Sequence, residues 1–420
     1  MNAEIINIGD ELLIGQVINT NAAWMAAQLN LSGFRVYQVT VISDSRGHIM
    51  QALADAEERA EVVLVSGGIG PTKDDLTKQT LCEFFNTRLV FNQEAYGDVE
   101  ALFARRGYAV TELNRQQAEL PENCTGIPNK VGTARGMWFE KDRPGGGKTV
   151  FVSMPGVPFE MKAMMTDYVI PRLKQMYTTP FIYHKTLLTQ GIGESFLAAE
   201  IEEWENSLPS NIKLAYLPQP GIVRLRLTGE GPGEILLHRQ VDAEMSKLVA
   251  LIPEYYFGYD EDTLEMIVGK LLAENHATLA TAESCTGGTI AQMITGIPGS
   301  SAYFKGSVVA YSNEIKEHIL GVSAENLEKF GAVSKQVVTE MAVSLQAKFR
   351  VDYAIATSGI AGPDGGTPGK PVGTTLIAIA SPGEVFAMQF LFGDSRERNI
   401  RRTALQALNM LRKKLIDICS

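Results

Sequence analysis

Short apolar runs alternate with amphipathic stretches of helical length along much of this sequence, and segments rich in glycine and serine follow several of the runs directly. The pattern is clearest at residues 3–8, 61–65, 278–282 and 353–357. Strands that alternate with helices of this length form parallel βαβ units. Parallel sheets bind their ligands at the carboxyl ends of the strands. The sequence therefore predicts α/β domains whose sites lie in the loops that follow strands.

Two interruptions divide the chain into three predicted domains. With 420 residues it exceeds the size at which one hydrophobic core stops growing, and breakers occur at Thr178-Thr179-Pro180 and near Pro253. We predict α/β domains over residues 1–176, where Asn21 is expected to cap a helix over 22–31, and over residues 255–420. Between them, residues 177–254 form a β-α-β-β-α pattern that resembles a KH-like module without the basic G-x-x-G loop that clamps RNA. We interpret this unit as a spacer or dimerisation domain.

Composition limits the partners that the protein is expected to have. The net charge is −10 and no long cluster of lysine and arginine occurs, which disfavours nucleic-acid binding. We expect no membrane span and no signal peptide, because neither a long apolar stretch nor a basic leader is present. The scattered cysteines indicate reduced thiols in the cytoplasm; they are Cys82, Cys124, Cys285 and Cys419. A small anionic ligand fits these limits.

The segment Thr281-Ala282-Glu283-Ser284-Cys285-Thr286-Gly287-Gly288 joins an apolar run to a predicted helix. Ser284 then lies on a tight turn at the end of a strand, as a nucleophilic serine does, although the segment is not G-x-S-x-G. The N–H groups at Thr286, Gly287 and Gly288 and the dipole of the helix favour an anion there. The alternative is that Ser284 and Thr286 only cap the helix.

A second loop, at Ser358, Gly359, Ile360, Ala361 and Gly362, also follows a strand of the C-terminal domain. Its glycines allow the backbone to fold closely around a ligand and to point several N–H groups inward. The alternative is an ordinary long loop.

A nucleophilic serine needs a base, and a third loop, Tyr311-Ser312-Asn313-Glu314-Ile315-Lys316, offers one. His276 precedes a strand, at the wrong end of the sheet, and His318 faces elsewhere on its helix. A desolvated lysine of lowered pKa serves as the base in Ser-Lys dyads, so Lys316 is the candidate unless it is a solvated helical lysine. Cys285 is a rival nucleophile, because a helix N-terminus lowers the pKa of a thiol, unless it is only a small buried residue that fills space.

Five motifs of the C-terminal domain together resemble the CinA (competence/damage-inducible protein) family: residues 281–288, 311–316 and 358–366, with Gly331-Ala332-Val333-Ser334 and Pro371-Val372-Gly373-Thr374. The C-terminal domain of that family is similar to stand-alone nicotinamide-nucleotide amidases. Those enzymes hydrolyse nicotinamide mononucleotide to nicotinate mononucleotide and ammonia. The resemblance implies that Ser284 is the nucleophile, that Lys316 is its base, that Tyr311 and Asn313 lie close by, and that the amidase needs no cofactor.

The substrate phosphate is expected either at the helix start after Ser284 or on an arginine of the last helix, which begins near Arg396. Arg396, Arg398, Arg401 and Arg402 are available there, and an alignment of that helix with the family favours Arg401. The alternative for these arginines is a solvated helical face.

The N-terminal domain resembles the molybdopterin-binding fold of molybdenum-cofactor adenylyltransferases, which CinA proteins share. The match rests on the glycine turn Gly67, Gly68 and Gly70, on Asp44 and Asp75, on the opening Gly9-Asp10-Glu11, and on the turn that contains Pro155 and Gly156. In the CinA family this domain has been associated with a metal-dependent ADP-ribose pyrophosphatase. The resemblance implies a phosphate cradle and a divalent metal ion held by Asp44, Asp74 or Asp75. A helix-capping role explains Asp10 and Glu11 equally well.

We therefore predict a bifunctional hydrolase of pyridine-nucleotide salvage that acts on nicotinamide mononucleotide and ADP-ribose and, as the family expectation, forms a homodimer. Three alternatives stay open. The N-terminal domain binds a nucleotide or pterin without catalysis, the protein is an adenylyltransferase of molybdenum-cofactor synthesis, or it is a binding protein of competence or DNA repair.

Overall fold

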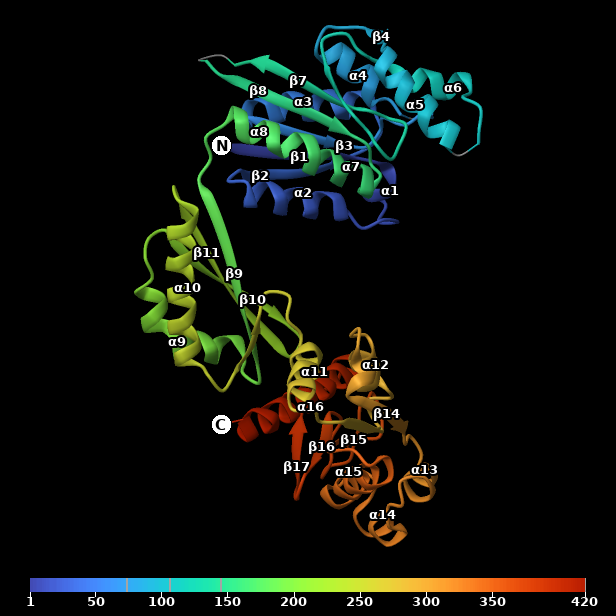
Figure 1. Ribbon diagram of the computed structural model, residues 1–420, viewed down its shortest axis with the longest axis vertical. Helices are drawn as coiled ribbons and strands as arrows, with labels where there is room; N and C mark the ends of the chain where they lie inside the picture. Colours follow the sequence, from blue (N-terminus) through green and yellow to red (C-terminus); the bar gives the residue numbers. More distant parts are fainter. Residues whose placement is uncertain (73–74, 106, 144–145, 420) are drawn as a thin grey trace. The chain divides into compact units, whose positions relative to one another are not determined.

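The computed structural model describes residues 1–72, 75–105, 107–143 and 146–419, and the chain packs as two compact units (Figure 1). The first comprises Met1–Tyr183 and Glu230–Leu237, and the second comprises His184–Gly229 and His238–Ser420. None of the helices in the described ranges has the length and apolar composition of a membrane span.

The first unit is a three-layer α/β/α structure around a sheet in the order β2-β1-β3-β8-β7-β6. Strands β2, β1, β3 and β8 are parallel, and β7 and β6 are antiparallel additions. Its strands are β1 (Asn2–Ile8), β2 (Arg35–Ile42), β3 (Val62–Ser66), β4 (Leu89–Phe91), β5 (Glu119–Pro121), β6 (Thr125–Ile127), β7 (Gly136–Asp142) and β8 (Lys148–Met154). Its helices are α1 (Asp10–Leu13), α2 (Thr20–Leu31), α3 (Arg46–Arg59), α4 (Thr77–Phe84), α5 (Gln93–Arg105), α6 (Glu112–Arg115), α7 (Pro158–Met164) and α8 (Ile170–Met176), with a 3-10 turn at Gln116–Ala118 and a π-helical turn at Met165–Val169.

Alternate residues of each central strand face the two helical layers. Ile5 and Leu64 pack in the same buried cluster as α2, α7 and α8, whereas Ile6 and Val65 pack with α3, α4 and α5. The cap of α2 corrects one prediction: Asn19, not Asn21, accepts the N–H of Ala22 at 3.0 Å.

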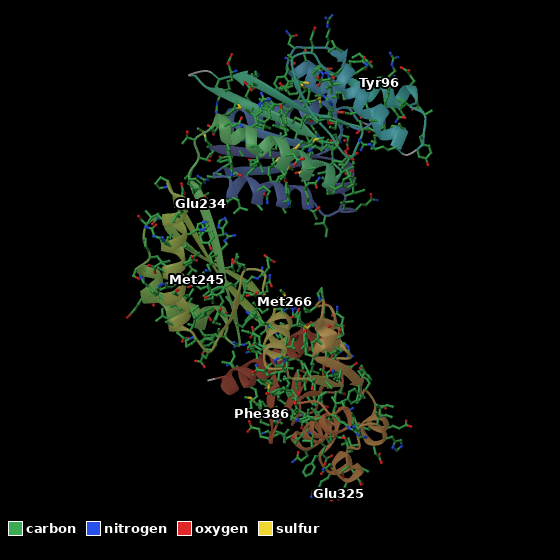
Figure 2. All side chains as sticks on the ribbon, in the orientation of Figure 1. Tyr96, Glu234, Met245, Met266, Glu325 and Phe386 are labelled. Carbon is green, nitrogen blue, oxygen red and sulfur yellow. The ribbon has the colours of Figure 1, made fainter. Side chains whose placement is uncertain are left out.

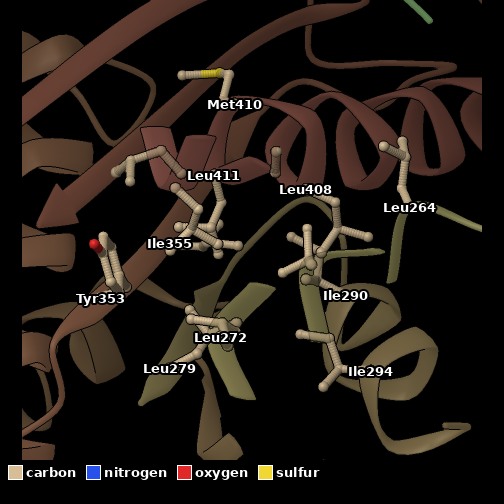
Figure 3. Close-up of a cluster of buried hydrophobic side chains, with 14 of the residues drawn as sticks. Leu264, Leu272, Leu279, Ile290, Ile294, Tyr353, Ile355, Leu408, Met410 and Leu411 are labelled. Carbon is tan, nitrogen blue, oxygen red and sulfur yellow. The ribbon is translucent and has the colours of Figure 1, made fainter. Parts of the chain in front are cut away.

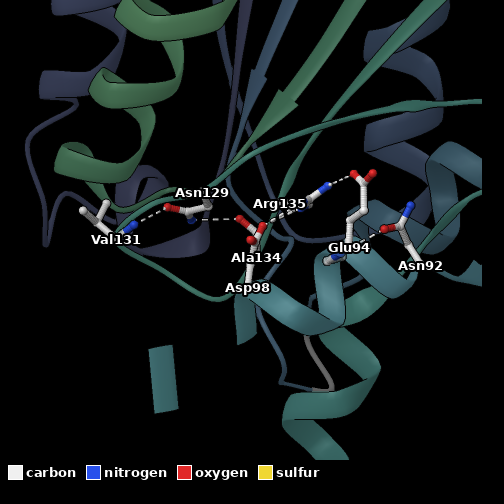
Figure 4. Close-up of polar contacts among 8 residues, drawn as sticks. Asn92, Glu94, Asp98, Asn129, Val131, Ala134 and Arg135 are labelled. Carbon is white, nitrogen blue, oxygen red and sulfur yellow. Dashed lines mark hydrogen bonds and ion pairs between the residues drawn. The ribbon is translucent and has the colours of Figure 1, made fainter. Parts of the chain in front are cut away.

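A polar cluster ties α5 to the loop that precedes β7 (Figure 4). Arg135, whose side chain is 9% exposed, donates to Asp98 Oδ2 at 2.8 Å and to Glu94 Oε2 at 3.4 Å. In the same loop Asn129 Nδ2 donates to the carbonyl of Ala134 at 2.9 Å. Because two carboxylates of α5 face the buried guanidinium of Arg135, these ion pairs hold the loop against α5 where no strand pairing does.

The second unit begins with a small α+β part, which has a sheet in the order β10-β11-β9-β12. Its elements are β9 (Phe181–Gln190), α9 (Glu194–Asn206), β10 (Ile212–Gln219), β11 (Ile222–Gly231), α10 (Glu234–Leu251) and β12 (Tyr256–Tyr259), of which the first residues of β9 and α10 and the last residues of β11 belong to the first unit. Leu225 and Leu227 of β11 are fully buried, as are Leu197 of α9 and Met245 of α10, which Figure 2 labels. This arrangement confirms the predicted KH-like pattern.

The rest of the second unit is an α/β domain with a sheet in the order β14-β13-β15-β16-β17. Strands β14, β13 and β15 are parallel. Beside β15 the sheet continues with the antiparallel hairpin of β16 and β17. Its strands are β13 (Leu279–Glu283), β14 (Phe304–Val309), β15 (Tyr353–Gly359), β16 (Thr374–Ser381) and β17 (Glu384–Leu391). Its helices are α11 (Leu264–Glu274), α12 (Thr289–Thr295), α13 (Asn313–His318), α14 (Ala324–Phe330), α15 (Lys335–Phe349) and α16 (Arg396–Cys419), with a 3-10 turn at Ser300–Ala302.

Side chains of α11, α12 and α16 cover one face of this sheet, where Leu272, Ile290 and Leu408 meet Ile355 (Figure 3). Helix α15 covers the other face with residues such as Met341. The same cluster that contains α16 also contains Leu188 of β9 and Phe257 of β12. The apolar core of this domain is therefore continuous with the KH-like part.

Candidate functional site

Three parallel strands of the second unit end at one edge of their sheet and bring the predicted loops together. Ser284 follows β13, Lys316 lies in the helix after β14, and Ser358 is near the end of β15. The backbone N–H of Ser284 donates to the carbonyl of Thr357 at 3.0 Å, which fixes the serine turn against β15.

The loops enclose a cavity of about 290 Å³. Most of the residues predicted for the site line it: Ser284, Tyr311, Asn313, Lys316, Ser358, Gly359, Ile360, Ala361 and Gly362. The lining also includes Cys285, Ala332, Val333, Asp364, Gly365 and Arg396. The serine, the lysine and the glycine loop therefore share one cavity.

Lys316 is 1% exposed, and its Nζ donates to the carbonyls of Ala310 at 2.8 Å, Tyr311 at 3.3 Å and Ser312 at 3.5 Å. Among the described residues no carboxylate pairs with this ammonium group. Burial lowers the pKa of Lys316 from its ordinary value. Ser284, 8% exposed, opens into the same cavity. No hydrogen bond joins these two side chains in the described part of the chain, and such contacts are often loose before substrate binds.

The environment of Cys285 contradicts its predicted activation. Burial raises the pKa of this thiol to about 12. A thiol of such high pKa holds little thiolate near neutral pH. The lowered thiol pKa on which the case for Cys285 as a nucleophile depends is therefore absent at this turn.

The predicted anion contact at Thr286, Gly287 and Gly288 is corrected by the structure, because none of the three lines the cavity. The carboxylate of Glu283, fully buried at the end of β13, accepts the N–H groups of Gly288 at 3.1 Å, Ile290 at 3.0 Å and Ala291 at 2.8 Å. An internal anion thus already occupies the N-terminus of α12. A phosphate there would meet a like charge and find few donors.

The arginine at the cavity is Arg396, not the predicted Arg401. Arg396 donates to the carbonyl of Gly362 at 2.7 Å and to the hydroxyl of Tyr311 at 2.9 Å. Arg401 lies five residues farther along α16, a rotation of about 140° around the helix axis at 3.6 residues per turn. It lines a different cavity, with Leu188 and Arg224.

Three other lining residues were not predicted as site residues, although the sequence motifs at 331–334 and 358–366 contain them. Ala332 and Val333 belong to the motif before α15, and the carbonyl of Ala332 accepts the hydroxyl of Ser358 at 2.8 Å. Asp364 lies in the glycine-rich loop. Their contribution depends on how the loops meet in space.

In the first unit, the carboxyl ends of β1, β3 and β8 also meet, around the predicted glycine turn. An added Cβ would lie 2.2 Å from the carbonyl oxygen of Ile8 at Gly67, 2.2 Å from Thr77 Oγ1 at Gly68 and 2.6 Å from Asp75 Oδ2 at Gly70. Gly67 and Gly68 also have positive φ values of 115° and 65°. Side chains are therefore excluded from this turn.

The second turn of this site lies against the first. Gly156 follows Pro155, and a Cβ on it would lie 3.5 Å from Gly67 Cα. The side chain of Asn21 donates to the carbonyl of Gly156 at 2.7 Å, and the Ser66 hydroxyl donates to the carbonyl of Pro155 at 3.2 Å. The predicted residues of the two turns thus form one cluster.

Carboxylates border this cluster. Asp44 Oδ2 accepts the N–H of Asp10 at 3.1 Å, and Asp75 Oδ2 accepts the N–H and hydroxyl of Thr72 at 2.9 and 2.5 Å. Burial raises the pKa of Asp44, and the nearby charges of Asp10, Glu11 and Asp75 add to the rise. Within the described ranges, no three His, Cys, Asp or Glu side chains are placed to hold one metal ion. Asp74 lies outside the described residues.

Three buried polar atoms beside the glycine turn fit a ligand. Asn7 Oδ1, Asn21 Oδ1 and Thr77 Oγ1 have no hydrogen-bond partner among the described residues. Buried polar atoms without partners cost free energy and often mark a site for a ligand, ion or water. The donor set of Asp44 and Asp75 is of the oxygen type that hard divalent cations prefer.

The sequence is similar to known families along nearly its whole length. A family model described as the CinA C-terminal domain matches residues 261–415, one described as a probable molybdopterin binding domain matches residues 4–175, and one described as the damage-inducible protein CinA KH domain matches residues 184–258.

Full-length relatives share this organisation. A CinA-like protein of Flavobacterium psychrophilum is 48% identical over 420 residues, which cover 99% of both chains. Another, from Cytophaga hutchinsonii, is 45% identical over 416 residues, 99% of this chain and 98% of the relative.

Solved structures match part of the chain. A crystal structure of a CinA superfamily protein from Klebsiella pneumoniae is 34% identical and covers 37% of this chain and 96% of that chain, with a TM-score of 0.36. The structure of a CinA protein from Thermoplasma acidophilum, described as of unknown function, is 32% identical and covers 42% of this chain and 98% of that chain, also with a TM-score of 0.36.

Proposed function

The chain belongs to the CinA family, with a molybdopterin-binding-like N-terminal domain, and from that premise we propose that its C-terminal domain deamidates nicotinamide mononucleotide. One observation carries the proposal. The hydroxyl of Ser284 and the buried amine of Lys316, which pairs with no carboxylate among the described residues, open into the same cavity. A lysine whose pKa is lowered by burial holds more of the neutral form that can accept a proton.

The reaction begins when Ser284 Oγ attacks the carboxamide carbon and Lys316 Nζ accepts the hydroxyl proton. The new C–O bond gives a tetrahedral oxyanion, which needs N–H donors such as those of the glycine loop. When the C–N bond breaks, the Lys316 ammonium group returns the proton to the nitrogen, and ammonia leaves. A water molecule then gives up a proton to Lys316 and attacks the acyl ester. When the ester C–O bond breaks, the Lys316 ammonium group returns that proton to Ser284 Oγ, which releases nicotinate mononucleotide and restores the serine hydroxyl and the neutral lysine.

Arg396 is the group we assign to the phosphate. A guanidinium has five N–H donors, and Arg396 uses two nitrogens on Gly362 and Tyr311, so further donors are available. Charge-assisted pairs of arginine with phosphate are strong and oriented.

Ammonia release from nicotinamide mononucleotide by the purified full chain tests this proposal. We expect activity in the parent and its loss in Ser284→Ala and in Lys316→Ala. An inactive parent would refute the substrate. Full activity in Ser284→Ala would refute the dyad.

For the N-terminal domain we propose binding and hydrolysis of ADP-ribose, supported by the unpartnered buried atoms beside the glycine turn. The pyrophosphate would lie on the turn of Gly67, Gly68 and Gly70, with Asn7 and Asn21 accepting hydrogen bonds from ligand hydroxyls. A divalent cation held by Asp44 and Asp75 would neutralise phosphate oxygens and supply a polarised water. Addition of water across the P–O–P bond gives AMP and ribose 5-phosphate.

Product analysis separates this activity from its alternative. We expect AMP and ribose 5-phosphate from ADP-ribose with magnesium or manganese present, and their loss in Asp44→Asn or in EDTA. Tight binding of ADP-ribose without products would instead support a nucleotide- or pterin-binding domain.

A further inference from the structure

A second cavity in the same compact unit, which we call the junction cavity, is larger than the cavity of Ser284. Its volume is about 500 Å³, against about 290 Å³. One side is formed by the turn between β9 and α9, and the other by the end of β17 and the middle of α16. Both sides belong to the second unit. The predicted functions do not use this cavity.

Aromatic rings line part of the junction cavity. Phe390 and Phe392 stack with ring centroids 5.6 Å apart and planes 3° from parallel, and Tyr255 lines the cavity as well. Flat aromatic surfaces of this kind hold heterocyclic bases by stacking.

Amide side chains form a row beside the rings. Gln190 Nε2 donates to Gln406 Oε1 at 2.9 Å, and Asn409 Nδ2 donates to Gln190 Oε1. Gln190 and Asn409 are 5% and 2% exposed, which places them deep in the unit. Asn409 Oδ1 also accepts the Nε–H of Arg412 at 2.8 Å. The remaining capacity of the row therefore lies mainly in Gln190 and Gln406, whose amides can still offer N–H groups and acceptor lone pairs to the edge of a planar ring.

The charge of the lining favours an anion. Arg402 and Lys413 are its two cations and Glu194 is its one anion, and the other lining residues are neutral. In the described part of the chain, Lys413 has no ion pair. Helix α9 begins at this cavity, and its N-cap, Gly193, has no capping side chain. The first N–H groups of that helix add a partial positive charge.

From the stacked rings, the amide row and the positive lining, we propose that the junction cavity is a second ligand site that binds a nucleoside 5′-monophosphate. The base would lie against Phe390 and Phe392, and the phosphate would lie near Lys413 and Arg402.

The geometry also connects this site to the cavity of Ser284. Arg402 donates to the carbonyl of Phe392 at 2.8 Å, and the N–H of Phe392 donates to the carbonyl of Gly373 at 3.1 Å. The N–H of Gly373 in turn donates to the carbonyl of Ile360 at 2.8 Å, and Ile360 lines the Ser284 cavity. A ligand that moves Arg402 or Phe392 would therefore shift the glycine loop through this series of hydrogen bonds. This coupling, unlike the binding itself, rests on the proposed deamidase.

Equilibrium dialysis of AMP with the full chain tests the binding. We expect Lys413→Met and Phe390→Leu each to raise the Kd of AMP at the junction cavity at least tenfold and to leave any other AMP site unchanged. Lys413 is exposed, so its replacement should not affect folding, and Phe390→Leu keeps apolar volume while it removes the ring. The matched control is Lys270→Met, which removes a lysine that is 71% exposed and lines neither cavity. AMP binding that is unchanged in both junction variants would overturn the proposal.

Two fragments of the probe test its parts. Adenosine lacks the phosphate and ribose 5-phosphate lacks the base, and we expect each to bind the Lys413-sensitive site at least tenfold more weakly than AMP. Adenosine that binds as tightly as AMP would overturn the assignment of a phosphate. Ribose 5-phosphate that binds as tightly would overturn the assignment of a base.

Steady-state deamidation tests the coupling. We expect saturating AMP to change the KM for nicotinamide mononucleotide in the parent and in Lys270→Met but not in Lys413→Met. An unchanged KM in the parent, with AMP bound, would overturn the coupling. If the parent has no deamidase activity, the proposed function fails, and the dialysis experiments still decide whether the site exists.

Discussion

Replacement of Arg396 by glutamine removes the guanidinium that donates to Gly362 and Tyr311 at the mouth of the Ser284 cavity. A hydrogen bond to a charged group contributes about 1.5–3 kcal/mol, and 1.36 kcal/mol corresponds to a factor of ten in rate. If the same guanidinium also holds the substrate phosphate, Arg396→Gln should lower kcat/KM for nicotinamide mononucleotide about 10- to 150-fold. Most of the loss should appear in KM, because the phosphate does not react.

The assay compares nicotinamide mononucleotide with nicotinamide riboside, which has the same amide but no phosphate. Arg396→Gln should lower the rate on the nucleotide far more than on the riboside. Arg401→Gln is the matched control on the same helix and should leave both rates near those of the parent. An equal loss on the two substrates would show that Arg396 acts only by holding the loop. A loss confined to Arg401→Gln would refute the assignment and restore the choice made from the sequence.

Three other predictions concern both sites. Cys285→Ser should retain deamidase activity, as measured by ammonia release, since burial holds the Cys285 thiol protonated. The deamidase rate should rise with pH through a midpoint below 10.5, the ordinary pKa of lysine, because only neutral Lys316 accepts a proton and burial lowers its pKa; Lys316→Arg, which stays charged, should be inactive across the whole profile. Gly68→Ala should abolish ADP-ribose binding in calorimetry, because its Cβ would lie 2.2 Å from a threonine hydroxyl at a φ of 65°. Gly47→Ala, in the first turn of α3, is the control and should bind normally, because nothing lies within 4 Å of the new Cβ.

The sequence predicted much of the fold because its central strands are short, uniformly apolar and bounded by glycine or proline. The element predicted at 353–357 is β15, and the helix predicted after Thr286 begins three residues later, at Thr289. The sequence predicts no element between residues 85 and 147, so the 13-residue helix α5 and the seven-residue strand β7 are missed there, together with β4, β5 and β6, which have only three residues each. Strands of that length carry no periodicity, so only their partners define them.

The site was predictable where its residues follow strands, and less so where it depends on side-chain direction. Ser284 and Lys316 line one cavity because parallel strands end at one edge of the sheet. The anion contact predicted at Thr286 was wrong because the carboxylate of Glu283 turns inward and caps α12. No local pattern in the sequence distinguishes an inward-turned glutamate from an exposed one. Arg396 and Arg401 differ in their angle around one helix. The sequence gives that angle, but it does not give the side of the helix on which the cavity lies.

The continuous core that links Leu188 and Phe257 to the sheet of β13 and β15 has a consequence for how this architecture is inherited. The segments that match the KH and C-terminal family models share one apolar core in this chain, because the KH-like strands bury part of the apolar surface of the C-terminal domain. A gene cut near residue 260 would leave that surface exposed to water. A relative that consists of the C-terminal domain alone must therefore cover the same apolar patch in another way or replace its residues with polar ones.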